Sequence, residues 1–112
     1  MFKLKQTPTF KWPVEVNIAT DGGKFVKETF DAEFKRVTQP ELAELQRKIE
    51  AGELTDRALV QSIITGWDGV TEDGEPVPFS QQALGQMLDI PGAAAGIVFA
   101  FVQAQSGVVR KN

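Results

Sequence analysis

The 112-residue chain contains no cysteine, no histidine and no tyrosine. The lack of cysteine excludes disulfides, thiolate catalysis and zinc–thiolate sites. The lack of histidine removes the side chain that most often acts as a general base near neutral pH and as a metal ligand. Only carboxylates, lysines and hydroxyl groups remain for chemistry. We therefore expect no catalytic residues, no cofactor and no bound metal.

Basic residues are missing from most of the second half. Residues 58–109 contain neither lysine nor arginine, although five acidic residues lie among them: Asp68, Glu72, Asp73, Glu75 and Asp89. Nucleic-acid binding depends on basic side chains that neutralise phosphates, so this half is a poor candidate for it. The basic residues of the first 36 positions alternate with acidic ones, which is typical of a solvated strand face. We expect no nucleic-acid partner.

The chain also lacks a long uninterrupted apolar run. The most apolar stretch, residues 90–104, contains Pro91, Gly92 and Gly96 and is shorter than the roughly 20 residues of a membrane-spanning helix. The N-terminal residues M-F-K-L-K-Q-T-P-T-F lack the apolar core of a secretory signal. These features predict a cytoplasmic protein without a membrane partner.

Apolar residues alternate in the first third of the chain. They recur at every second position from Phe10 to Ile18, and again in a second run that includes Phe30 and Phe34. The turn sequence A-T-D-G-G separates the two runs, and Pro13 favours an edge position for the first. Residues 10–37 are therefore predicted to form an antiparallel hairpin or meander with one aromatic face.

The period becomes helical from Thr38 onward. Thr38 and Glu41 have capping-box spacing, and Gly52 is a suitable helix stop. A second helix is expected from Thr55 to Gly66, a third from Ser80 to about residue 90, and an alanine-rich fourth after it. The chain is thus predicted to be a single compact α+β domain, 1–112, with strands in 10–37, about four α-helices in 38–105 and a flexible tail at 106–112.

The segment from Ile63 to Leu88 holds a conspicuous aromatic pair. Trp67 follows the expected helix stop, and Phe79 precedes the Ser80 cap. The favoured interpretation makes Trp67 a core residue at the junction of the second and third helices, and Phe79 a staple pairing with the residue at 84 or its neighbour. The alternative makes Trp67 a partly exposed anchor for a partner.

The acidic loop within this segment has no ligand spacing. Counted from Asp68, position three of an EF-hand would be Val70 and position twelve Phe79, so the calcium pattern fails. A catalytic pair of Asp68 and Asp73 would need desolvation, which a glycine-containing acidic loop does not favour. The loop is interpreted as a solvated turn.

The expected last helix is apolar on more than one face. A small domain has difficulty covering such a helix with its own core, which favours self-association or binding of a client protein. The candidate surface consists of Ile97, Val98, Phe99, Phe101 and Val102.

The order and spacing of several short motifs resemble those of a known family. The motifs are T-F-D-A-E-F-K-R-V, G-W-D-G-V, P-V-P-F-S and A-L-G-Q-M-L-D. From about Phe25 to Leu88 the chain resembles the tail assembly chaperones of long-tailed, non-contractile bacteriophages. The resemblance implies a scaffold role for six residues: Gly66, Trp67, Val70, Pro78, Phe79 and Leu88.

The resemblance also implies a non-enzymatic function. Such chaperones coat the long helical tape-measure protein in the bacterial cytoplasm until tail-tube subunits polymerise around it, and they are absent from the mature virion. They are expected to form homo-oligomers. A longer, frameshifted form recruits the tail-tube protein, and this chain corresponds to the short form. Two other hypotheses are a structural tail protein of the tube or tail-completion type, and a small enzyme that uses only carboxylates.

Overall fold

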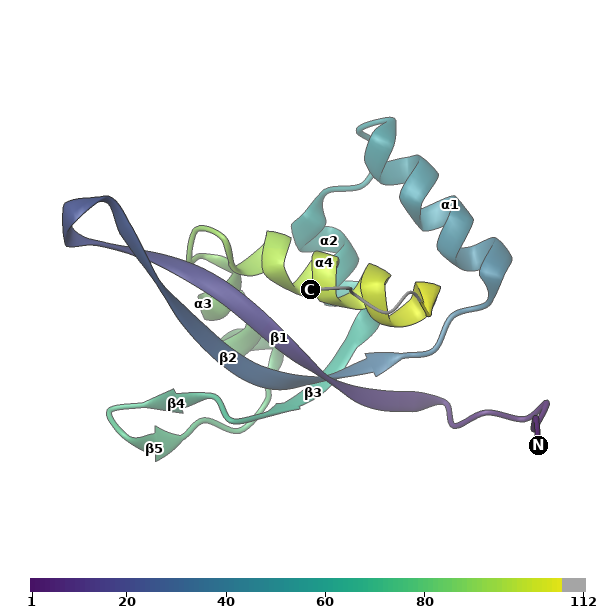
Figure 1. Cartoon of the computed structure of the whole chain (residues 1–112), viewed down its shortest axis with the longest axis horizontal. Helices are drawn as coiled ribbons and strands as arrows, with labels where there is room; N and C mark the ends of the chain where they lie inside the picture. Colours follow the sequence, from purple (N-terminus) through teal and green to yellow (C-terminus); the bar gives the residue numbers. More distant parts are fainter. Residues whose placement is uncertain (108–112) are drawn as a thin grey trace.

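Strands β1 (Thr9–Thr20) and β2 (Lys24–Lys35) form a long antiparallel hairpin in the computed structural model, which describes residues 1–107 (Figure 1). The register runs without interruption from Thr9↔Lys35 to Thr20↔Lys24. The short 3-10 turn between the strands, η1 (Asp21–Gly23), contains two glycines with φ of 79° and 75°. The hairpin and its glycine turn are therefore confirmed.

The hydrogen-bond pattern shows which backbone groups of β1 face its partner. The Arg36 N–H donates to the Pro8 carbonyl at 2.9 Å, one step beyond the first register pair. Hydrogen-bonded pairs alternate along an antiparallel ladder, so the even-numbered residues of β1 bond to β2 and the odd-numbered ones point outward. The N–H that Pro13 lacks would have pointed to the outer edge, so the hydrogen bonds between β1 and β2 are unaffected. With the strand order β1-β2-β3, its predicted edge position is confirmed.

A third strand occupies part of the segment that was expected to be helical. Helix α2 (Asp56–Ile63) stops before Gly66, and strand β3 (Ile64–Asp68) pairs antiparallel with β2 from Asp31 to Phe34. The predicted helix end at Gly66 is thus wrong. The physical reason is that β-branched residues run from position 63 to 65 and that the Thr65 hydroxyl donates to the Glu33 carboxylate at 2.7 Å.

The acidic turn after β3 is itself a small hairpin, made of β4 (Thr71–Glu72) and β5 (Glu75–Pro76). Three residues here have positive φ, including the non-glycine Asp73 at 50°. The helical segment predicted for 38–105 is therefore interrupted between residues 64 and 76.

The four predicted helices are α1 (Gln39–Glu50), α2, α3 (Gln81–Leu88) and α4 (Ala93–Ser106). Thr38, Thr55 and Ser80 accept a backbone N–H at the first turns of α1, α2 and α3, as predicted. Figure 1 shows α1, α2 and α4 on one side of the hairpin and β4–β5 on the other. The α+β fold is confirmed. Ser106 still belongs to α4, and residues 108–112 of the predicted tail lie outside the described residues.

The core lies between the hairpin and the helices. Its largest fully buried side chains come from β1, β2, α2, α3 and α4, and they are Val14, Phe34, Leu59, Val60, Leu84, Ile97 and Phe101. The rings of Phe34 and Phe101 meet edge-on, with centroids 5.4 Å apart. This contact joins the last helix to the central strand.

Candidate partner-binding surfaces

Trp67 is a core residue on β3. Its side chain is 9% exposed, and its ring packs edge-on against Phe30 and Phe79, with centroid distances of 6.1 and 5.0 Å. Its indole N–H donates to the Val77 carbonyl at 2.8 Å. The core interpretation is correct, although Trp67 lies on a strand rather than at a junction of two helices. Its burial excludes the alternative of an exposed anchor.

The residues of the proposed scaffold differ in burial. Gly66 lies opposite Glu33 in the sheet, and Leu88 is buried on α3. Val70 and Phe79 are half-buried against the core, while Pro78 is exposed. The scaffold role of these residues and the pairing of Phe79 with Leu84 stay predictions.

The acidic loop carries one cross-strand ion pair. Lys11 of β1 donates to the Asp68 carboxylate, and this hydrogen bond, followed by the charge attraction, raises the pKa of Lys11 above its ordinary value. Glu72, Asp73 and Glu75 are exposed on or between β4 and β5. Within residues 1–107, no three His, Cys, Asp or Glu side chains come together as a metal site would need.

Helix α4 divides the candidate surface into an inner and an outer part. Ile97 and Phe101 are 0% exposed, so they belong to the core and not to a docking surface, and their place in that surface is corrected. The reason is that both belong to the core cluster, in which Phe101 meets Phe34 of β2. Val98 and Val102 are half-buried, and Phe99 is 57% exposed.

Two glycines allow α4 to approach the outer edge of β1. A Cβ atom added at Gly96 would lie 2.7 Å from the Glu15 carbonyl oxygen, and one added at Gly92 would lie 3.3 Å from the Asn17 oxygen. Both oxygens belong to odd-numbered residues, whose backbone groups point outward. The helix therefore covers this part of the free edge. Glycines four residues apart in an apolar run were the sequence signal for this contact, and it was missed.

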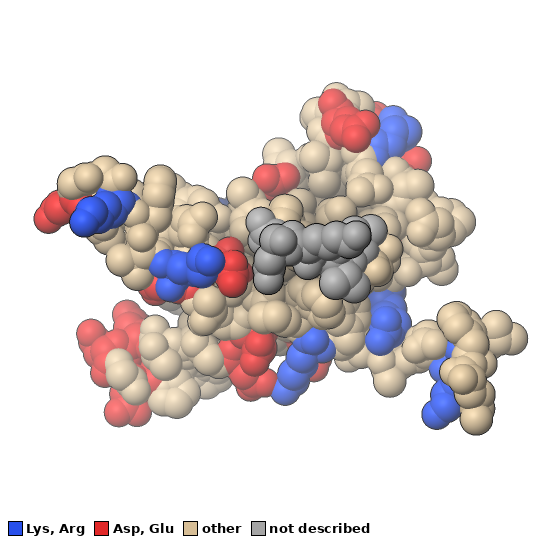
Figure 2. All heavy atoms as spheres, in the orientation of Figure 1, with Lys and Arg blue, Asp and Glu red and all other residues tan. Residues whose placement is uncertain are grey.

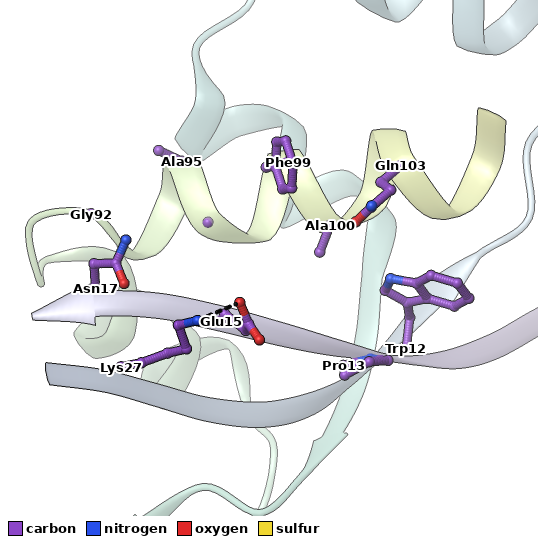
Figure 3. Close-up of a pocket in the computed structure, with 11 residues that line it drawn as sticks. Trp12, Pro13, Glu15, Asn17, Lys27, Gly92, Ala95, Phe99, Ala100 and Gln103 are labelled. Carbon is purple, nitrogen blue, oxygen red and sulfur yellow. Dashed lines mark ion pairs between the residues drawn. The ribbon is translucent and has the colours of Figure 1, made fainter. Parts of the chain in front are cut away.

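A groove of about 720 Å³ runs between β1 and α4 (Figure 3). Its walls include Ala95 and Gln103 from α4 and the exposed Trp12 from β1. The charged groups that line it are Glu15 and Lys27, whose carboxylate and ammonium are 3.4 Å apart. Helix α4 itself has no charged residue. The groove therefore combines small and aromatic side chains with little net charge.

A second groove, of about 320 Å³, lies along β2 and is lined in part by the core residues Val16 and Phe30. Its walls come from β1, from β2, from the chain at residues 69–71 and from residues 87–93, which run from the end of α3 to the start of α4. The apolar side chains that line it are Val16, Ile18, Phe30, Val70, Met87, Ile90 and Ala93. Ile90 and the neighbouring Val26, which pairs with Ile18, are exposed. This groove could not be predicted from the sequence, because its walls come from four separate segments.

No single helix of the described chain is long and apolar enough to span a membrane. Helices α3 and α4 reach the required length and composition only as a pair, which is bent by 107°.

Comparison with known proteins gives one match. A family model described as phage tail assembly chaperone matches residues 1–112. No curated protein and no solved structure matches the chain.

Proposed function

Since the chain belongs to the phage tail assembly chaperone family, which is non-enzymatic, we propose that it binds the tape-measure protein and keeps it soluble while tail-tube subunits assemble. It acts in the cytoplasm of the bacterial host and is absent from the mature virion. A longer, frameshifted form of the same chain binds the tail-tube protein. The match over the full length is the observation that carries this proposal.

The groove between β1 and α4 is the surface that best fits such a client. A tape-measure protein is long, helical and apolar. A helical client binds by laying its apolar face into a groove of its partner. Ala95 contributes a small, exposed side chain to this groove, so another helix can come close to α4 there. Trp12 at its end supplies an aromatic anchor of the kind that is enriched in binding hot spots.

The charge distribution supports the same function. The chain has a formal net charge of −3, and the acidic side chains of β4–β5 lie on the side of the hairpin away from α4 (Figure 2). A coat of such subunits presents acidic surface to solvent, while the groove, whose two charged groups are paired with each other, faces the client. Net charge of one sign keeps an apolar complex dispersed.

Co-expression with the tape-measure protein of the same phage tests both the function and the surface. The wild-type chain should keep the client in the soluble fraction. Ala95→Glu puts a charge on the groove at the third position of α4, where an acidic residue suits the helix dipole and leaves the fold intact. With this variant, most of the client should move from the soluble to the insoluble fraction.

Ala43→Glu is the matched control, because Ala43 is an exposed alanine on α1, away from the groove. It should solubilise the client as the wild type does. A client that stays insoluble with the wild-type chain would contradict the function. A client that stays soluble with Ala95→Glu would contradict only the choice of surface.

A further inference from the structure

Half of β2 has an unpaired outer edge. The even-numbered residues of β2 bond to β1, so the backbone groups of Phe25, Lys27 and Thr29 point the other way. Strand β3 pairs with β2 only between Asp31 and Phe34, and no other strand of residues 1–107 continues along this edge. An unpaired edge is a template for an additional strand.

The 320 Å³ groove lies directly beside this edge. Phe30 and Glu28 of β2 form one wall, and Val70 and Thr71 form the opposite one. A strand added to β2 would therefore place every second side chain in an apolar groove. Its other side chains would face away from it.

The N-terminal arm, residues 1–6, has the matching pattern. Phe2 and Leu4 are 84% and 95% exposed, and they alternate with Lys3 and Lys5. In the single chain the arm is bent at Leu4 and Lys5, and the Gln6 side-chain amide donates to the Lys3 carbonyl at 2.8 Å. Once this exposed bend opens into an extended arm, the two apolar side chains lie on one face and the two lysines on the other. Figure 1 shows the arm projecting from the body at the end opposite the hairpin turn.

The arm is too short to reach the groove of its own chain. Thr7 is held by the Arg36 guanidinium at 3.3 Å, so only the residues before it are free to move. Six extended residues span about 20 Å, whereas the nine residue-to-residue steps along β1 from Thr9 to Ile18 cover about 30 Å. The arm therefore cannot lie along Phe25–Thr29 of its own chain.

Charge favours the same pairing. The arm has two lysines and no acidic residue, while the β4–β5 hairpin beside the groove has Glu72, Asp73 and Glu75 and no basic residue. Figure 2 shows these acidic side chains at the lower left, and lysine on the arm at the lower right. Attraction between them steers the arm of one copy toward the hairpin of another.

We propose that the arm of one copy adds as a strand to the outer edge of β2, at Phe25–Thr29, in a second copy. Phe2 and Leu4 fill the groove, and Lys3 and Lys5 lie near the acidic hairpin. Donor and acceptor are different surfaces, so the contact is head-to-tail and can repeat from copy to copy. This contact goes beyond client binding and does not depend on it, since it can be measured without the client.

Analytical ultracentrifugation of the purified chain provides the test. The wild type should form species larger than a monomer at high concentration. Phe2→Ser/Leu4→Ser removes the apolar face of the arm, and Thr29→Pro removes one outward N–H of β2 without breaking the ladder to β1, as Pro13 does in β1. Each variant should stay monomeric with an unchanged circular dichroism spectrum. The exchange variant Phe2→Leu/Leu4→Phe keeps the alternation and should associate like the wild type.

Mixing the two monomeric variants makes the test specific. Thr29→Pro retains the arm, and Phe2→Ser/Leu4→Ser retains the edge, so together they should form a one-to-one dimer that grows no further. A monomeric wild type, or association of either variant at wild-type strength, would overturn the proposal. If Thr29→Pro fails to fold, the peptide M-F-K-L-K-Q replaces it. Titration of the peptide should shift the amide signals of residues 25–29 with a dissociation constant at least tenfold lower than that of the scrambled peptide M-F-L-K-K-Q. Equal dissociation constants would count against the arm.

Discussion

Gly96 is the residue at which the packing of α4 is most sensitive to change. A methyl group added there would meet the Glu15 carbonyl oxygen at 2.7 Å, a backbone atom that cannot move aside cheaply. Gly96→Ala should therefore lower the free energy of unfolding by about 1–3 kcal/mol, in spite of the better helix propensity of alanine. Urea denaturation measures this change.

Gly85 on α3 is the matched control. A Cβ atom there would be 3.7 Å from the end of the Arg57 side chain, an ordinary contact. Gly85→Ala should leave stability unchanged or raise it by up to about 1 kcal/mol. Equal destabilisation by both substitutions would show that the contact with β1 is not the cause.

Phe101 and Phe25 represent a core phenylalanine and a surface phenylalanine. Phe101 is fully buried against Phe34, whereas Phe25 is 68% exposed near the hairpin turn. Phe101→Ala should lower the free energy of unfolding by about 3–5 kcal/mol, and Phe25→Ala by less than about 1 kcal/mol. Thermal or urea unfolding checks both. Similar losses for the two would contradict the burial of α4.

At the scale of elements, the start of α1 couples stability to pH. The backbone N–H of Thr38 donates to the Glu41 carboxylate at 3.0 Å, and this hydrogen bond lowers the pKa of Glu41 below its ordinary value of 4.5. A lowered pKa in the folded state contributes stability above the unfolded value. That stability is lost as the pH falls from about 4.5 through the folded pKa.

Glu41→Gln isolates this contribution, because the amide oxygen can still accept the Thr38 N–H but does not titrate. Between about pH 7 and about pH 3, the free energy of unfolding of the variant should fall less than that of the wild type. Urea denaturation at the two pH values measures the difference. An identical fall in both proteins would mean that Glu41 does not contribute to the acid sensitivity.

The elements that were predicted correctly have local signals. The capping box at Thr38, the caps at Thr55 and Ser80 and the alternation along β1 are written in adjacent residues. The local signal for strand β3 is short and ambiguous. Ile63 and Ile64 extend the apolar stripe of α2, and only pairing with β2 decides that the helix stops between them.

At the scale of the molecule, the α+β order followed from the sequence, but the division of α4 into inner and outer faces did not. Nearly all side chains of α4 are apolar, so composition could not tell Phe101 from Phe99. The glycine contacts with Glu15 and Asn17 fix the rotation of the helix, and they bring together residues about 80 positions apart. The second groove was hidden for the same reason.

The arm and its acceptor lie at opposite ends of a molecule whose longest dimension is 45 Å. Copies joined through them would advance along the client by at most that length each. A helix rises 1.5 Å per residue, so one copy would span about 30 residues of a helical client. The number of chaperones needed would then scale with the length of the tape-measure protein, and longer-tailed phages would consume proportionally more subunits for every tail.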